Sequence, residues 1–265
     1  MPRAVVVAEV RFLSELPCRP PAGTTDFGPI VRETKHENML GKSLCWNCQS
    51  TAGGQVFCPQ CVKLQPVGPD SDYFQHLGFP RRLAIQPKEL EDRFHELSRK
   101  YHPDFFQNQS DREKEVSLEN SAYLNAAYRT LRDPIRRVEY LIRLEEGAAK
   151  NIPAKAPPDL LEEIIALQET LEDYRQRRSH DAAAASKLEV RLRRDQGRIS
   201  ERKNSVEEEL FNLFGDWDRP GLDPVKRREL LARMKDLMSS RAYFVTVLED
   251  LEDSLPGKGG TVKIS

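Results

Sequence analysis

Apolar side chains recur at intervals of three and four residues through nearly all of the chain after residue 70, and this periodicity restricts the fold more than any other feature. No segment there alternates between apolar and polar residues for more than a few positions, as a half-buried strand would. The sequence therefore predicts an all-α fold for this region. With 265 residues, the chain is long enough to bury one large core or two small ones.

Prolines and glycines set the first helix boundaries. Ser71 is expected to cap a short helix that stops before Gly78. Pro87 suits the first position of a longer helix, and Pro103 ends that helix. The apolar residues of the longer helix lie four, three and four positions apart and share one face: Leu90, Phe94, Leu97 and Tyr101.

Two more helices are expected over 111–131 and 135–144, because Asp133-Pro134 interrupts the pattern between them. The last hundred residues carry three further apolar stripes with the spacing of helices that pack side by side. These stripes run from Leu160 to Tyr174, from Leu188 to Leu213 and from Leu230 to Leu251. They predict a three-helix bundle.

Stretches rich in proline and glycine divide the chain into segments. The predicted segments are a largely disordered stretch over 1–40, a four-cysteine module over 41–66, a helical domain over 70–146, the helical bundle over 152–254 and a flexible tail over 255–265.

Four of the five cysteines lie within 17 residues and form two C-x2-C pairs: Cys45, Cys48, Cys58 and Cys61. Each pair places two thiolates on one tight turn, as tetrahedral zinc requires. The nine residues between the pairs are enough for a small hairpin that brings the second turn back to the first. The spacing predicts one structural zinc ion, held in a small zinc-ribbon-like module and closed by four sulfurs, so that it is not catalytic.

Two disulfides or four free thiols are the alternative, and they are less favoured because the sequence shows no secretory signal. A redox role for either C-x2-C pair would need a βαβ context, which the pattern lacks. Cys18 lies far from the cluster and is expected to be a bystander.

The tripeptide His102-Pro103-Asp104 follows directly on the helix that contains Tyr101. A histidine and an aspartate on a proline-fixed turn are exposed polar groups that can make directional hydrogen bonds to a partner. Arg99 and Lys100 stand just before the turn, on the outward face of this helix.

This helix, the His-Pro-Asp turn and a returning helix that ends with residues 125–134 (Asn-Ala-Ala-Tyr-Arg-Thr-Leu-Arg-Asp-Pro) resemble the J-domain of DnaJ-type co-chaperones. The opening Asp-Tyr-Phe-Gln-His-Leu-Gly at 72–78 matches as well. A J-domain followed by residues 131–141 and then a helical bundle is similar to the HscB family of iron–sulfur cluster assembly. The likeness covers roughly residues 70–253, and the four-cysteine module resembles that of animal mitochondrial members.

The resemblance implies an adaptor that is not itself an enzyme. In such proteins the turn stimulates the ATPase of a DnaK/HscA-class chaperone. The resemblance therefore assigns chaperone contact to His102, Pro103 and Asp104. It also assigns Arg93, Arg99 and Lys100, which would steer the turn toward an acidic surface; the alternative for these three is an ordinary solvated charge. The five histidines show no Ser or Cys nucleophile at interpretable spacing, and no phosphate-binding glycine loop occurs.

The resemblance also implies that the bundle binds an IscU-type cluster scaffold. The residues assigned to that contact are Leu161, Ile165, Glu169 and Asp173 on the first helix of the bundle and Phe244 on the last. Leu160, Ile164 and Leu167 fit the bundle interior, which leaves Leu161 and Ile165 as a neighbouring stripe. Phe244 also belongs to the third stripe, where a core role is favoured. Glu162 and Ala166 depart from the family pattern, so the detailed contacts stay open.

The net charge of -1 gives no electrostatic reason to bind nucleic acid or anionic lipid. Only Lys42 and Lys63 lie near the cysteines, too few for a phosphate track, and the longest apolar run is too short to cross a bilayer.

The expected location is the bacterial cytoplasm, with the mitochondrial matrix as the alternative. A J-protein for an unrelated client and a zinc-ribbon nucleic-acid binder are the competing functions, and self-association stays open.

Overall fold

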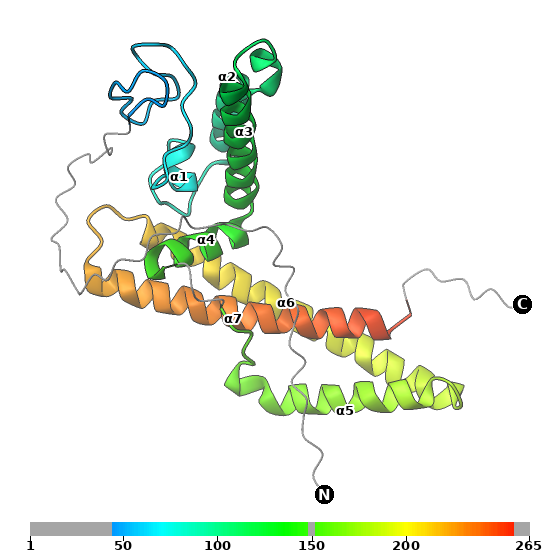
Figure 1. The fold of residues 1–265 in the computed structure, drawn as a ribbon. Helices are drawn as coiled ribbons and strands as arrows, with labels where there is room; N and C mark the ends of the chain where they lie inside the picture. Colours follow the sequence, from blue (N-terminus) through cyan, green and yellow to red (C-terminus); the bar gives the residue numbers. More distant parts are fainter. Residues whose placement is uncertain (1–43, 148–151, 257–265) are drawn as a thin grey trace, which may run out of the picture. The chain divides into compact units, whose positions relative to one another are not determined.

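The computed structural model describes residues 44–147 and 152–256, which fold mostly into helices from Tyr73 onward (Figure 1). Within these ranges the β-structure is limited to two isolated antiparallel bridges, Leu44 with Thr51 and Phe57 with Leu64. The predicted mostly helical fold class is confirmed. The predicted disordered segment 1–40, which contains Cys18, lies outside the described residues, as do Lys42 and residues 257–265 of the predicted tail.

The first group of helices spans residues 73–146. Its elements are α1 (Tyr73–His76), α2 (Pro87–Tyr101), the 3-10 turn η1 (Pro103–Phe106), α3 (Asp111–Arg132) and α4 (Pro134–Glu146). Prolines occupy the first positions of α2 and α4, where the missing N–H costs no hydrogen bond. Helices α2 and α3 pack along each other as a hairpin (Figure 1).

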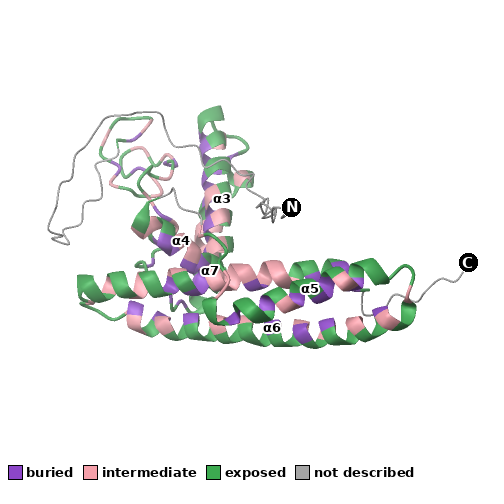
Figure 2. Ribbon diagram, turned by 90° about the horizontal axis from the view of Figure 1, so that it is seen from below, coloured by how far each residue is buried: buried purple, intermediate pink, exposed green. Residues whose placement is uncertain are grey.

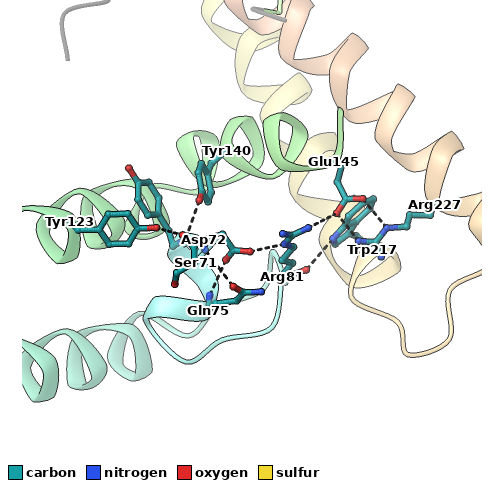
Figure 3. Close-up of polar contacts among 10 residues, drawn as sticks. Ser71, Asp72, Gln75, Arg81, Tyr123, Tyr140, Glu145, Trp217 and Arg227 are labelled. Atoms are coloured by element: carbon teal, nitrogen blue, oxygen red, sulfur yellow. Dashed lines mark hydrogen bonds and ion pairs between the residues drawn. The ribbon is translucent and has the colours of Figure 1, made fainter. Parts of the chain in front are cut away.

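The cap of α1 differs from the prediction, because Asp72 and not Ser71 is the N-cap residue. The Asp72 carboxylate accepts a hydrogen bond from the Gln75 N–H at 2.9 Å, and the Gln75 side chain accepts one from the Asp72 N–H at 3.5 Å. This reciprocal pair satisfies two donors, and a carboxylate is favoured at a helix N-terminus. The Ser71 carbonyl instead accepts a hydrogen bond from the Tyr123 hydroxyl (Figure 3).

The second group contains the 3-10 turn η2 (Pro158–Leu160) and three helices, α5 (Leu161–Arg177), α6 (Ala182–Trp217) and α7 (Pro224–Ser254). Their mutual packing confirms the expected three-helix arrangement. Figure 2 shows exposed residues along the outer sides of α5 and α6, as expected for helices rich in arginine and glutamate. Of the predicted tail, Leu255 is only 6% exposed and packs with the core of this bundle.

The apolar residues of α6 and α7 divide between two cores, which the sequence did not predict. The N-terminal part of α6 and the C-terminal part of α7 pack with α5. The other parts of these helices pack with the helices of residues 73–146, through Leu210, Phe214, Trp217, Met234, Leu237 and Met238. An apolar stripe reveals which side of a helix is buried, but not which helix covers it.

Polar contacts reinforce this shared core (Figure 3). Arg81 pairs with Asp72 at 2.8 Å, while Arg227 pairs with Glu145 on α4 at 3.0 Å. The guanidinium of Arg227 also lies over the Trp217 ring, 4.2 Å from its centroid. These contacts join α4 to α6 and α7, so the two groups of helices pack directly against each other.

His76 is a partly buried titratable group within the first group of helices. Its ring lies against the rings of Tyr101 and Tyr123, with centroids 5.7 and 5.0 Å away. Its Nε2 atom has no hydrogen-bond partner among the described residues. Burial lowers the pKa of His76 to about 4, because the charged ring would lose its hydration.

We expect His76 to make the folded state sensitive to acid. An unfolded histidine binds its proton near pH 6.5, so protons favour the unfolded chain below that pH. The free energy of unfolding should therefore fall between pH 6.5 and 4, by about 2 kcal/mol from this group once solvent screening of the partly exposed ring is allowed for. Urea titrations at several pH values measure the free energy of unfolding, and in His76→Phe this free energy should fall less between pH 6.5 and 4 than in the wild-type chain. The same pH dependence in both chains would contradict the prediction.

Candidate functional site

The turn after α2 presents His102-Pro103-Asp104 at one end of the helical hairpin. Helix α2 ends at Tyr101, because Pro103 has a fixed φ and no N–H with which to continue the helix. The Tyr101 carbonyl accepts hydrogen bonds from the hydroxyls of Ser117 and Ser121 on α3, at 2.5 and 3.2 Å. These bonds fix the end of α2 against α3, so the turn starts from a rigid point.

The two polar residues of the turn face solvent, with the side chain of His102 51% exposed and that of Asp104 70% exposed. The His102 Nδ1 atom accepts a hydrogen bond from the backbone N–H of Asp104 at 3.3 Å. The same Nδ1 atom lies 3.4 Å from an Asp104 carboxylate oxygen, so the imidazole and the carboxylate stand next to each other at the tip of the turn. The turn thus offers a partner one N–H donor and one carboxylate acceptor, side by side.

The three predicted basic residues of α2 are all exposed, but their charges are not equally available. Arg93 and Lys100 share Glu96, at 3.0 and 2.8 Å. Hydrogen bonds from Lys100 and then Arg93 lower the pKa of Glu96 and keep it ionised. Arg99 forms no ion pair with another described residue, so an acidic partner meets no competing carboxylate there. Sequence reasoning missed Glu96, although its three- and four-residue spacing from these cations could have revealed it.

The four predicted metal-binding cysteines come together. All four Sγ atoms lie within 4.8 Å of one another, and the Sγ atoms of Cys45 and Cys61, and of Cys48 and Cys58, are 3.6 Å apart. Four sulfurs around one zinc, each at about 2.3 Å, would be about 3.8 Å apart, whereas a disulfide bond is about 2.05 Å long. The cysteines are free thiols, and their arrangement fits a tetrahedral metal ion.

Both cysteine pairs use the same backbone turn. The Gln49 N–H donates to the Cys45 carbonyl at 3.0 Å, and the Val62 N–H donates to the Cys58 carbonyl at 2.9 Å. Gln49 and Val62 adopt left-handed φ values of 59° and 58°, although a β-branched residue such as Val62 is strained there. The C-x2-C spacing and this turn together place two thiols on one side of the backbone.

Nearby donors favour the thiolate form, which binds metal, at Cys45 and Cys58. At Cys61 the Lys63 N–H acts in the same direction, but burial and the neighbouring Cys45 and Cys48 thiols outweigh it and raise the pKa to about 11. The Ser50 hydroxyl lies 3.0 Å from Cys48 Sγ and 3.3 Å from Cys58 Sγ, and it lowers the pKa of Cys58 to about 6. Burial raises the pKa of Cys45, but the N–H groups of Cys48 and Asn47 outweigh that effect, so this pKa is also lowered. Ser50 was not predicted, because no spacing rule marks a hydroxyl beside a metal site.

The cysteine module is attached to α3. Lys63 pairs with Glu113 at 2.7 Å, and the Glu113 side chain is only 4% exposed. Burial raises the pKa of Glu113, but hydrogen bonds from Lys63 and Ser110 outweigh burial and keep the carboxylate ionised. The buried Asn120 side chain donates to the Gln65 carbonyl at 2.8 Å and accepts from the Val67 N–H at 3.1 Å.

The predicted partner-binding face of α5 is largely open to solvent. Leu161 and Ile165 are 53% and 48% exposed, whereas the neighbouring stripe is buried: Leu160, Ile164 and Leu167. Glu169 is exposed, and Asp173 forms an ion pair with Arg177 at 3.5 Å. Phe244 is different, because it is 1% exposed in the core shared with α5 and α6 and so offers a partner no surface.

Among the described helices, none is both long enough and apolar enough to span a membrane.

Comparisons with known proteins agree with these features. The DnaJ domain family matches residues 72–140. The iron–sulfur cluster co-chaperone protein HscB of Mus musculus is 32% identical over 220 residues, which cover 80% of this chain and 84% of the mouse protein. Human HscB is 34% identical over 128 residues, 47% of this chain and 54% of that protein. The crystal structure of human co-chaperone protein HscB is similar with a TM-score of 0.51 and 26% identity, covering 79% of this chain and 97% of that one.

Proposed function

The chain belongs to the HscB family of iron–sulfur cluster co-chaperones, and we propose on this basis that it stimulates the ATPase of a DnaK/HscA-class chaperone and delivers an IscU-type scaffold to it. The observation that carries the proposal is the exposed His102-Pro103-Asp104 turn, held at the end of a packed helical hairpin. The chain itself is not the enzyme; the hydrolysing site belongs to the chaperone.

In the proposed contact, His102 donates a hydrogen bond through Nε2 and Asp104 accepts one from the chaperone. Because the end of α2 is fixed to α3, little conformational entropy is lost when these groups bind. Arg99 contributes long-range attraction to an acidic surface, and Arg93 and Lys100 join it once the partner competes with Glu96.

Scaffold delivery is the second half of the proposal. Segment 70–146 would engage the chaperone, while α5 within segment 152–254 would bind the scaffold through Leu161, Ile165, Glu169 and Asp173. The shared core between these segments limits how far the two partners can move apart. Binding both partners through one chain raises the effective concentration of the scaffold at the chaperone, to the millimolar range for short tethers.

Leu161→Ala combined with Ile165→Ala should weaken scaffold binding by about 10- to 100-fold. Each exposed apolar side chain buried in such an interface contributes about 1 kcal/mol or somewhat more. Titration calorimetry with an IscU-type scaffold measures this loss directly. Val190→Ala on α6 is the matched control, because Val190 is an equally exposed apolar residue, at 61%. An unchanged Kd in the double variant would exclude this patch.

We also propose that the metal is zinc and that its role is structural. Four thiolates fill the coordination of zinc and leave no open position for a substrate. When bound, the ion would link the two turns that begin at Cys45 and Cys58. The bacterial cytoplasm, with the mitochondrial matrix as the alternative, remains a prediction from the sequence.

Chaperone stimulation is tested directly by the steady-state ATPase rate of a DnaK/HscA-class chaperone at increasing concentrations of this chain. We expect a saturable, several-fold rise over the basal rate. An ATPase rate that stays at its basal value at a large excess of this chain would contradict the proposal.

A further inference from the structure

Two consecutive phenylalanines follow the His-Pro-Asp turn, and they have opposite environments. Phe106 is 8% exposed and packs in the core of α1–α4. Phe105 is 66% exposed, the next residue along the chain after Asp104. A phenyl ring that is mostly in water adds little to folding, so its position beside the polar turn calls for another explanation.

The backbone that carries the Phe105 ring is held in place. The Phe105 N–H donates to the His102 carbonyl at 3.0 Å, within the 3-10 turn. The Phe105 ring meets the His102 imidazole edge-on, with centroids 6.1 Å apart and planes at 69°. Phe106, buried next to it, anchors the same turn to the core. The turn therefore displays an aromatic ring whose freedom is already restricted before any partner binds.

Aromatic residues dominate the affinity of protein interfaces when a partner pocket buries them, and a pre-ordered ring loses little entropy on binding. We propose that Phe105 is the apolar anchor of the chaperone-binding turn and enters an apolar pocket of the chaperone. This inference rests on the proposed function. In this proposal, burial of the Phe105 ring contributes affinity in addition to the hydrogen bonds made by His102 and Asp104.

The alternative role for the same ring is to orient the His102 imidazole. The two roles separate kinetically. An anchor determines how much of the chain is needed for half-maximal stimulation of the ATPase, whereas loss of His102 orientation lowers the maximal rate at saturation. Phe105→Leu also distinguishes them, because leucine keeps apolar bulk but loses the edge-on ring contact.

The experiment measures the ATPase rate of a DnaK/HscA-class chaperone across a titration of each full-length variant. Surface plasmon resonance in the presence of ATP measures the affinity of each variant for the chaperone. Phe105→Ala should raise the half-maximal concentration about ten-fold, with an unchanged maximal rate and unchanged helical circular dichroism. Phe105→Leu should lie between wild type and Phe105→Ala. Val190→Ala, the exposed apolar control on α6, should match wild type.

An unchanged half-maximal concentration in Phe105→Ala would overturn the anchor while leaving the proposed function intact, since wild type still stimulates. A lowered maximal rate at unchanged affinity would also overturn it, in favour of His102 orientation. If wild type itself neither binds nor stimulates the chaperone, the proposed function fails and the anchor fails with it.

Discussion

Replacing His102 by glutamine is expected to return the chaperone's ATPase rate to its basal value while the chain stays folded. The imidazole is half exposed, and among the described residues its polar contacts are the hydrogen bond from the Asp104 N–H, 3.3 Å long, and the Asp104 carboxylate, 3.4 Å from Nδ1. Loss of such a bond costs about 1 kcal/mol at most. The fold should therefore survive, whereas the glutamine amide does not place an N–H donor where the imidazole Nε2–H that we assign to the chaperone contact lies.

The measurement combines ATPase stimulation, thermal unfolding and scaffold affinity on the same His102→Gln protein. His95→Gln is the matched control, because His95 is likewise an exposed histidine and lies on α2 away from the turn, 3.8 Å from Glu91. The control should stimulate normally. Loss of stimulation together with loss of helical content or scaffold binding would mean that His102→Gln merely unfolds the chain, and normal stimulation would remove His102 from the mechanism.

Removal of the metal is the second change with a large expected effect. Cys58→Ser, or a chelator, should reduce the zinc content from about one ion per chain to near zero, since three ligands hold zinc far more weakly than four. The module should then unfold locally. That would expose Leu64, which is fully buried, and leave Asn120 without its two backbone partners.

The unfolding midpoint should consequently fall by about 10 °C. Exposing a buried leucine and orphaning a buried amide together cost about 3 kcal/mol, and each kcal/mol shifts the midpoint of a chain this size by about 2–4 °C. Metal analysis and calorimetry provide the readouts. Cys18→Ser is the control and should keep both the metal and the midpoint. Full stability in the metal-free Cys58→Ser chain would show that the module does not support α3.

Local chemistry explains why much of this structure could be predicted from the sequence. Pro87 and Pro103 define the limits of α2 because proline fixes φ and lacks an N–H, whichever residues pack nearby. The cysteine cluster is equally local, since each C-x2-C turn closes through its own backbone hydrogen bonds. The exposure of Leu161 and Ile165 follows from helical periodicity alone.

The remaining features depend on contacts between distant residues. Nothing in the spacing of Phe214 and Trp217 shows that they pack with the helices of residues 73–146. Asp218 accepts hydrogen bonds from the Leu83 and Ala84 N–H groups at 2.8 and 2.7 Å, over 130 positions away. The burial of Phe244 was favoured by its stripe, yet its assignment to a partner contact came from the family resemblance and finds no exposed surface here.

The central claim is that one chain connects chaperone activation to a particular client. The most direct test is the steady-state ATPase rate of a DnaK/HscA-class chaperone with this chain alone, with an IscU-type scaffold alone and with both. The account predicts a rate with both that exceeds the sum of the separate increments, and loss of that excess when Leu161 and Ile165 are both alanine. Stimulation by the chain that the scaffold leaves unchanged would contradict the account and favour a J-protein with another client.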